Sequence, residues 1–444
     1  MGGGRKPDGV RTVPAAAEDL ATFENASREL SELQAPMLHE GTRKEGRLFI
    51  AAFDGTGNNM FEDAPENHTN VAYVAKQVES LKDPAIGHGY VAGPGTQGGV
   101  EGIYDLAKGQ SYSSRMEDMY LQFTVKASAW LKENPDADIR VASIGFSRGA
   151  EQSAGLTRMI EERGIRDPEG ARVERDGDGL VLRVEYVGPP LREPGTVIQA
   201  VGLFDPVGTG EPRNHDRRLP PSVVSGFQIT AEDERRNLFQ STRVLDPGVT
   251  DGGRFLNVTV AGAHSDIGGS YSLDGLSIRS GNLMIDYLNA LSDPPFLQKR
   301  EEPGDPARNV IHRSEDHQFF YRTSVYDKEG IRGRQEELAP SNLCRIDCLD
   351  AQPRNAAMAE GLRWRPVEIG PVPVAGSPTN TVEQLLQAAK QGDATAIDRI
   401  GRDHLHSEQG QAWLRGGQQR LQELQPALPA VPVEPQRDPP VLAR

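Results

Sequence analysis

The sequence predicts an α/β fold in which a doubly wound, mostly parallel sheet is covered by helices. Strands buried in a parallel sheet are typically short and largely apolar, and the chain has such runs at residues 48–53, 139–144, 197–204 and 255–261. Between the first two, over residues 116–131, apolar side chains recur every three or four positions, which indicates a helix. Strands that alternate with helices favour a parallel sheet with crossover connections.

The alternating pattern predicts one domain over residues 46–330. Within it, we expect a further helix over residues 70–81 and a glycine-rich loop over residues 87–109. Residues 165–195 are expected to be an inserted hairpin, because the sequence DGDG at residues 176–179 provides a turn between two short apolar runs.

The regions on either side of this domain are more polar. Residues 1–45 are expected to be an N-terminal extension with one helix around residues 20–33. Residues 331–370 are expected to form a peripheral segment and linker. Residues 371–444 are expected to form a polar helical tail whose proline-rich end is disordered.

Composition and charge restrict the possible partners. The chain has 444 residues, of which 36% are hydrophobic, 48 are glycine and 32 are proline, so a loop-rich protein is expected. Its 49 Lys and Arg residues against 64 Asp and Glu residues leave a net charge of −15. This charge disfavours binding to nucleic acids and unaided adsorption to anionic membranes. If such a protein attacked lipids, it would need delivery or apolar surface near its site.

Neither the cysteines nor the N-terminal sequence indicates a disulfide framework or a targeting segment. Cys344 and Cys348 are too few for such a framework, and a metal site would lack a second ligand pair, so free or buried thiols are expected. The first residues lack the apolar core of a Sec signal peptide, and Lys6 stands where a myristoylation motif has Ser or Thr. No window approaches the roughly 18 apolar residues of a membrane-spanning helix.

The sequence GFSRG at residues 145–149 fits the G-x-S-x-G nucleophile elbow. It follows a predicted strand and precedes a helical pattern that reaches about residue 163, which is the context that an elbow requires. The glycines are needed because larger side chains there would collide with the neighbouring strand and helix. Ser147 is therefore predicted to be a nucleophile at a helix N-terminus, whose dipole favours an oxyanion. A turn serine without a catalytic role is the alternative.

A serine nucleophile needs a base and a third group that orients the base. In α/β-hydrolases an acid and then a histidine follow the serine along the chain. Asp205 directly follows the predicted strand at residues 197–204, and His264 follows the strand at residues 255–261. Both stand at carboxyl ends of parallel strands, where open sheets form their sites. We therefore predict a triad of Ser147, Asp205 and His264.

Other assignments for the acid stay open. Asp205 precedes Pro206, and an Asp before Pro often only forms a turn. Asp266 and Asp54 are the alternative acids. Asp266 is two residues from His264 and is expected to shape the glycine-rich turn after it rather than to face the imidazole.

The oxyanion hole of such a site uses two backbone N–H groups. One is expected from Arg148, which follows the nucleophile, and the other from Gly55 or Thr56 in the loop after the first sheet strand. The sequence DGTG at residues 54–57 also resembles the phosphate-binding turn of actin-like ATPases. That alternative lacks a Walker lysine and leaves the elbow and the histidine without a role.

Several blocks together resemble a known family. They are FDGTGN at residues 53–58, GFSRGA at 145–150, GLFDPVG at 202–208, AEDERR at 231–236 and GAHSDIGGSY at 262–271. Their order and content resemble those of the DUF2235 hydrolases, which include the Tle1-type phospholipase effectors of type VI secretion. The resemblance covers about residues 46–290 and implies an α/β-hydrolase fold whose catalytic Ser, Asp and His correspond to Ser147, Asp205 and His264. Pro206 departs from the family, which usually has Thr there.

The resemblance implies a serine ester hydrolase that acts as a secreted antibacterial lipase or phospholipase effector on acyl esters of membrane lipids. It implies no metal or organic cofactor, a cognate immunity protein, and a secretion-apparatus or adaptor partner. The protein would pass from the producer's cytoplasm into the periplasm or membrane of a target cell. Two alternatives are a general carboxylesterase or acyltransferase on non-lipid esters, and a non-catalytic binding module with a hydrolase fold.

Overall fold

The structure is a computed structural model in which the chain forms two units, Met1–Val372 and Pro373–Arg444. The predicted N-terminal extension therefore belongs to the same unit as the sheet. The residues that the structure describes are 8–96, 111–177, 179–236, 238–250, 252–316, 332–343, 356–372, 385, 388–389 and 394–406. In the second unit they include the helix α11 (Ala394–His406). The remainder of the predicted tail helices, and both cysteines, lie outside the described residues.

A seven-stranded sheet forms the centre of the first unit, with the strand order β14-β15-β12-β11-β6-β4-β5. The strands are β4 (Gly46–Phe53), β5 (Ile86–Val91), β6 (Asp138–Phe146), β11 (Gln199–Phe204), β12 (Val223–Ala231), β14 (Gly248–Val249) and β15 (Phe255–Val260). All neighbours pair in parallel except the short edge strand β14, which is antiparallel to β15. The predicted α/β class with a mostly parallel sheet is confirmed.

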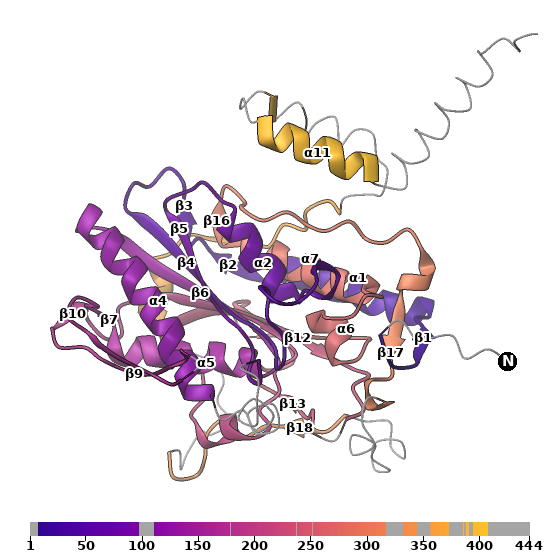
Figure 1. The fold of residues 1–444 in the computed structure, drawn as a ribbon, viewed down its shortest axis with the longest axis horizontal. Coiled ribbons are helices and arrows are strands. Elements are labelled where there is room, and N and C mark those ends of the chain that lie inside the picture. Colours follow the sequence, from indigo (N-terminus) through magenta and orange to yellow (C-terminus); the bar gives the residue numbers. More distant parts are fainter. Residues whose placement is uncertain are drawn as a thin grey trace, which may run out of the picture. The chain divides into compact units, whose positions relative to one another are not determined.

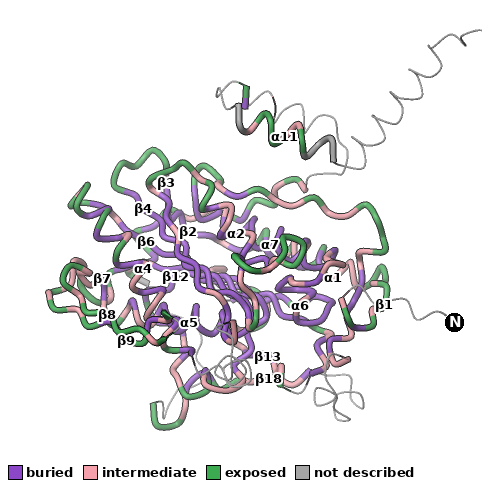
Figure 2. Tube along the Cα trace, in the orientation of Figure 1, coloured by how far each residue is buried: buried purple, intermediate pink, exposed green. Residues whose placement is uncertain are grey.

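Helices cover both faces of the sheet (Figure 1). One face carries α1 (Ala17–Glu32), α2 (Asn70–Glu79) and α7 (Gly275–Ala290), and the other carries α4 (Tyr112–Glu133) and α5 (Arg148–Arg163). Side chains alternate along a strand, so β4 serves both cores. Its even-numbered residues Leu48, Ile50 and Ala52 pack with α2 and α7, whereas Phe49, Ala51 and Phe53 pack with α4. Figure 2 shows the central strands as buried throughout.

Shorter elements surround the sheet. The short helices are α6 (His264–Gly268) and α9 (Ala356–Glu360). The strand pairs are β1 (Thr12–Pro14) with β17 (Val310–His312), β2 (Gln34–Pro36) with β19 (Trp364–Pro366), β3 (His39–Glu40) with β16 (Ser292–Asp293), β13 (Ser241–Thr242) with β18 (Arg334–Gln335), β7 (Ile165–Arg166) with β10 (Pro190–Arg192), and β8 (Arg172–Arg175) with β9 (Val181–Glu185). The last pair is the expected hairpin around DGDG. Within the described residues, no helix is both long and apolar enough to span a membrane.

The loop prediction for residues 87–109 is wrong at its start, because β5 occupies Ile86–Val91. The glycines that suggested a loop have a packing role instead. A Cβ at Gly87 would press on Trp130, and one at Gly89 would press on Met119, both of which belong to α4. The small residues therefore let this helix lie close to the edge strand. The end of the predicted loop lies outside the described residues.

The strand order creates a topological switch point, where sites usually form. From β4 the chain crosses to β5 on one side, and it then returns to β6 on the other side of β4. The direction of the crossovers therefore reverses between β4 and β6. In open parallel sheets, ligands bind beyond the carboxyl ends of the strands at such a switch point. The loop that begins at Asp54 and the turn that contains Ser147 both lie there.

Candidate active site

Ser147 stands in a sharp, strained turn between β6 and α5. Its φ of 60° and ψ of −125° lie outside the regions that side-chain-bearing residues favour. Strain of this kind persists only where the surroundings impose it, and it is common at functional sites. A Cβ on Gly145 would overlap the carbonyl of Gly149, and a Cβ on Gly149 would overlap the carbonyl of Phe53. The elbow therefore requires both glycines, for the steric reason that the sequence suggested.

Backbone hydrogen bonds join the elbow to the segment after β11. The N–H of Ser147 donates to the carbonyl of Phe204 over 3.0 Å, and its carbonyl accepts from the N–H of Val207 over 3.3 Å. Asp205 lies between these two residues, with a φ of 40°. The nucleophile turn and the predicted acid are thus held side by side by the pairing of β6 and β11.

Asp205 and His264 form a buried pair. Nδ1 of His264 lies 2.5 Å from Oδ2 of Asp205, and the two side chains are 4% and 0% exposed. His264 is the first residue of α6, which follows β15 through a short turn. With Nδ1 directed at the carboxylate, Nε2 is the ring nitrogen available to act as a base.

Two aromatic rings enclose the imidazole of His264. The ring of Phe146 lies against it at a centroid distance of 4.5 Å, and the ring of Phe239 meets it edge-on at 5.0 Å. Because Phe146 immediately precedes Ser147, the first contact brings the histidine to the elbow. Among the described residues no hydrogen bond joins Ser147 to His264. Such catalytic hydrogen bonds are often long without substrate and shorten when it binds.

Arg332 holds the carboxylate of Asp205 from another side. Nη1 of Arg332 lies 2.6 Å from Oδ1 and Nη2 lies 2.9 Å from Oδ2. The N–H of Ala231 donates to Oδ1 over 3.0 Å. Burial raises the pKa of Asp205, but the charge of Arg332 and the hydrogen bond from His264 outweigh it and lower this pKa to about 2. The carboxyl group of Asp205 is therefore ionised at neutral pH.

A second carboxylate supports the backbone of the histidine. Oε2 of Glu234 accepts from the N–H of His264 over 3.2 Å, and the same side chain forms an ion pair with Arg236 at 2.9 Å. Burial raises the pKa of Glu234, but the nearby Arg236 charge outweighs it and lowers the pKa to about 2. For His264, burial lowers the pKa below its ordinary value despite the hydrogen bond that its ring donates to Asp205. A neutral imidazole, as a base requires, is favoured.

Neither alternative acid contacts His264. Asp266 bonds to His312, with Oδ1 lying 2.5 Å from Nδ1. Asp54 is buried beneath its own loop, where it accepts hydrogen bonds from Tyr90 (2.6 Å), Thr69 (2.7 Å) and the N–H of Gly55 (2.8 Å). Burial raises the pKa of Asp54 to about 6. Its role in the structure is to shape the loop after β4.

The two backbone N–H groups expected as oxyanion donors after β4, those of Gly55 and Thr56, differ in whether they already donate a hydrogen bond. The N–H of Gly55 already donates to Asp54, which leaves the N–H of Thr56 as the better second donor. The side chain of Arg148 connects the loops around the elbow, because Nε donates to the carbonyl of Thr209 (3.1 Å) and Nη1 donates to Oγ1 of Thr56 (3.2 Å). Arg148 thus fixes Thr56 next to the elbow.

The sequence did not reveal two residues of this site. Glu234 lies in the acidic-basic block at residues 231–236, whose role had no local signal beyond its charges. Arg332 is 127 positions from its partner Asp205 in a region with little pattern, so only the folded chain could reveal it. No group of three or more His, Cys, Asp or Glu side chains in the described part of the chain is arranged to hold a metal ion.

The fold and these contacts define an α/β-hydrolase-like protein in which Ser147 stands in a sharp strand-to-helix turn. Residues 47–175 match the family described as "T6SS, Phospholipase effector Tle1-like, catalytic domain". The predicted resemblance to Tle1-type effectors is therefore confirmed over these residues. They contain Ser147, whereas Asp205 and His264 lie beyond them.

Comparisons with solved structures give distant similarities. The Tle1 effector bound to the VgrG spike from the type VI secretion system is 21% identical, with a TM-score of 0.31 over 53% of this chain and 52% of that one. An uncharacterized protein from Pseudomonas aeruginosa is 18% identical, with a TM-score of 0.35 over 96% and 68%. Thermogutta terrifontis esterase 2, phosphoramylated by tabun, is 13% identical, with a TM-score of 0.28 over 56% and 86%. The chain spans about half the length of that Tle1 effector chain. No curated protein matches the sequence.

Proposed function

We propose that this protein is a serine ester hydrolase in which Ser147 is the nucleophile, His264 the general base and Asp205 the acid that orients the base. The observation that carries the proposal is the buried 2.5 Å hydrogen bond between Asp205 and His264, beside a serine in a strained elbow. Asp54 and Asp266 have other partners, which supports Asp205 as the acid.

The proposed reaction has two steps. Nε2 of His264 accepts the hydroxyl proton while Oγ of Ser147 attacks the ester carbonyl, and the resulting oxyanion accepts hydrogen bonds from the N–H groups of Arg148 and Thr56. The tetrahedral intermediate collapses to an acyl-enzyme, and His264 returns the proton to the departing alcohol. Water, deprotonated by His264, then attacks the acyl-enzyme, and the acid product and Ser147 are released.

We further propose membrane lipids as the substrate class. The match of residues 47–175 to a phospholipase effector family supports this choice. Two exposed apolar side chains on segments beside the site also support it. Phe61, 73% exposed, lies on the loop after β4, and Leu238, 47% exposed, precedes the Phe239 that packs on His264. In a chain with a net charge of −15, apolar contact offers attraction to a lipid surface that electrostatics does not.

The proposed setting is competition between bacteria. The family match favours export by a type VI apparatus and entry into the periplasm or membrane of a target cell. A secretion-apparatus or adaptor partner and a cognate immunity protein that covers the cleft belong to this proposal. Residues 373–444, which form a separate unit, are proposed to serve in delivery.

Ser147→Ala tests the mechanism directly. Ester hydrolysis should fall by about six orders of magnitude, as it does when a triad serine is removed, and labelling by a fluorophosphonate should disappear. Ser143→Ala is the matched control, because Ser143 lies in β6, the strand that leads to the elbow, is fully buried, and has an Oγ without a hydrogen-bond partner among the described residues. It should keep activity and labelling. Activity of Ser147→Ala within tenfold of the wild type would exclude the mechanism.

The substrate class needs a separate measurement. Wild type and Ser147→Ala should be incubated with vesicles of phosphatidylethanolamine and phosphatidylglycerol, and the products analysed by mass spectrometry. Free fatty acid and lysolipid released only by the wild type would support the lipid proposal. Hydrolysis of small soluble esters alone would favour a general carboxylesterase, and the absence of both hydrolysis and labelling would favour a binding module.

A further inference from the structure

We propose that Arg332 is a positioning residue of the triad. It fixes the plane of the Asp205 carboxylate, which orients His264 as a base, and it balances the charge of that carboxylate, which keeps the imidazole neutral. This inference rests on the proposed function, which it deepens by adding a fourth residue. It concerns a residue that does not touch substrate and acts only through Asp205.

The geometry at the carboxylate supports a positioning role. Each oxygen of Asp205 accepts from the guanidinium: Oδ1 from Nη1 over 2.6 Å and Oδ2 from Nη2 over 2.9 Å. The other donors are the N–H of Ala231 on Oδ1 and Nδ1 of His264 on Oδ2. A planar fork on a planar carboxylate fixes the rotation of that group, which a single point charge would not do. Oδ2 is thereby held toward the imidazole.

Arg332 is itself held firmly. Nη1 donates to the carbonyl of Ala231 over 2.8 Å, while Nε and Nη2 donate to the carbonyl of Phe239 over 3.0 Å and 2.8 Å. The next residue, Gly333, accepts from the N–H of Ser241, at the start of the β13–β18 pairing. The side chain is 5% exposed. Arg332 therefore joins the segment before β18 to the ends of β11 and β12, where Asp205 and Ala231 lie.

The charges around His264 explain why a cation is needed there. Asp205 after β11 and Glu234 after β12 bring two carboxylates, and Arg236 and Arg332 bring two guanidinium groups. On α6 itself, Asp266 is directed at His312 instead. Without Arg332, two carboxylates would face the imidazole with only one guanidinium. An excess of negative charge stabilises the imidazolium, so the pKa of His264 should rise.

A merely structural arginine would behave differently, and the chain offers a matched control. Arg140 is also buried and also grips a carboxylate, with Nε and Nη2 donating to Asp138 and Nη1 donating to the carbonyl of Met37. It lies near the amino end of β6, whereas Ser147 follows the carboxyl end. Loss of Arg140 should affect stability without affecting the pH dependence of catalysis.

The first experiment compares pH–rate profiles of full-length wild type, Arg332→Gln, Arg332→Lys and Arg140→Gln. Because the base must be neutral, activity falls below the pKa of His264, and the acidic limb of kcat/KM reports that pKa. For Arg332→Gln this limb should move up by roughly one pH unit, and the plateau kcat should fall by about 100-fold, the typical cost of a misplacement of about 1 Å. Arg332→Lys keeps the charge without the fork, so its limb should stay near that of the wild type while kcat falls. Arg140→Gln should match the wild-type profile.

The second experiment measures the pKa of the His264 imidazole directly, without a substrate. The ¹⁵N resonances of His264, assigned by comparison with His264→Gln, should titrate at higher pH in Arg332→Gln than in the wild type. In an Asp205→Asn background, Arg332→Gln should cause a clearly smaller shift, because the arginine acts through that carboxylate. If His264 titrates identically in wild type, Arg332→Gln and Arg140→Gln, the inference is wrong. An active Ser147→Ala would instead refute the proposed function and leave the titration to decide the role of Arg332.

Discussion

Two aspartate–histidine pairs of almost identical geometry lie at this site, and the pKa values of their histidines are shifted in opposite directions. In Asp205–His264 and in Asp266–His312 the Nδ1 atom lies 2.5 Å from a carboxylate oxygen, and all four side chains are buried. Burial lowers the pKa of His264 below its ordinary value. For His312, burial acts in the same direction, but its hydrogen bonds to Asp266 and Asp8 outweigh it and raise the pKa. Hydrogen-bond length therefore does not decide the direction in which the pKa of the histidine is shifted.

The difference comes from burial and from the charges around each pair, because burial is the largest cause of the lowered pKa of His264 and the charge of Arg236 adds to it. His312 lies between two carboxylates, because its Nε2 is 3.0 Å from Oδ2 of Asp8. At the other pair, Arg332 takes up part of the charge of Asp205. The two carboxylates at His312 favour its charged form, whereas each of the two carboxylates near His264 is also paired with a guanidinium, which favours the neutral form.

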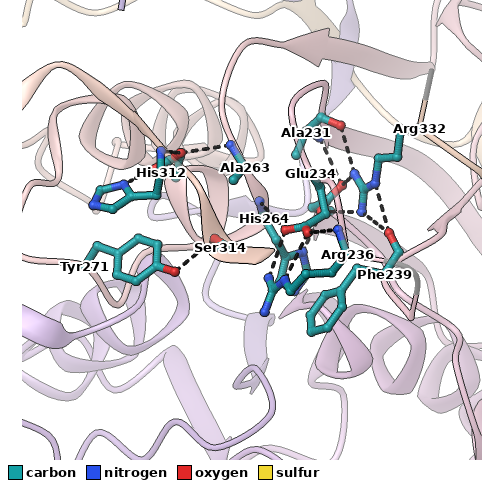
Figure 3. A network of polar contacts seen from close by, with 12 residues as sticks. Ala231, Glu234, Arg236, Phe239, Ala263, His264, Tyr271, His312, Ser314 and Arg332 are labelled. Atoms are coloured by element: carbon teal, nitrogen blue, oxygen red, sulfur yellow. Dashed lines mark hydrogen bonds and ion pairs between the residues drawn. The ribbon is translucent and has the colours of Figure 1, made fainter. Parts of the chain in front are cut away.

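The two histidines therefore have different tasks around α6. Asp266 belongs to this helix, so His312 ties α6 to β17, and Asp8 extends the link to the N-terminal segment. The ring of Tyr271 stacks on His312 at 3.9 Å (Figure 3). We infer that His312 holds in place the helix α6, which carries His264.

The largest expected difference between the pairs is in catalysis. Asp205→Asn should lower kcat by about 10⁴-fold, because an amide cannot stabilise the imidazolium and favours the wrong tautomer of His264. Asp266→Asn should lower kcat by less than about tenfold, because Asp266 only supports α6. Steady-state hydrolysis of a soluble ester measures both variants, with circular dichroism as the control for folding. Reversed effects would mean that the acid is misassigned.

The next effect concerns stability against pH. The pKa of His312 is raised in the folded state, so its stabilising contribution is fully present below the unfolded value of 6.5 and is lost as the pH rises through the folded pKa. His312→Gln should therefore cost about 3 kcal/mol at pH 5.5 and clearly less at alkaline pH. Urea unfolding of both proteins at several pH values measures this difference. An equal cost across the range would show that His312 is not charged in the folded protein.

The smallest effect separates stacking from hydrogen bonding at the second pair. Tyr271→Phe keeps the ring on His312 and removes the 2.9 Å hydrogen bond between the phenol and Oγ of Ser314. The expected loss is about 1 kcal/mol of unfolding free energy, with the pH dependence and the esterase activity unchanged. Thermal unfolding at two pH values tests this. A change in the pH dependence would mean that the hydroxyl helps to set the charge of His312.

Local sequence signals predicted the framework of this protein. Continuous apolar runs identified β4, β6, β11 and β15, because a strand that is buried on both faces is apolar at successive positions rather than at every second one. Two of the three other strands of this sheet, β5 and β12, escaped prediction for opposite reasons. In β5 the glycines that suggested a loop admit α4, and in β12 buried polar residues such as Gln228 find partners that only the fold supplies.

The sequence by itself determined the elbow and the order of the site residues, because glycine spacing and strand ends are local features that determine where Ser147, Asp205 and His264 appear along the chain. Only the tertiary structure decided which aspartate faces which histidine and that the N–H of Gly55 donates to the carboxylate of Asp54. It also decided that Arg332 contacts Asp205, which is 127 positions away along the chain. These contacts join distant segments whose charges carry no local pattern. The protonation of each histidine depends on the sum of such charges at short range, so it became visible only once the chain was folded.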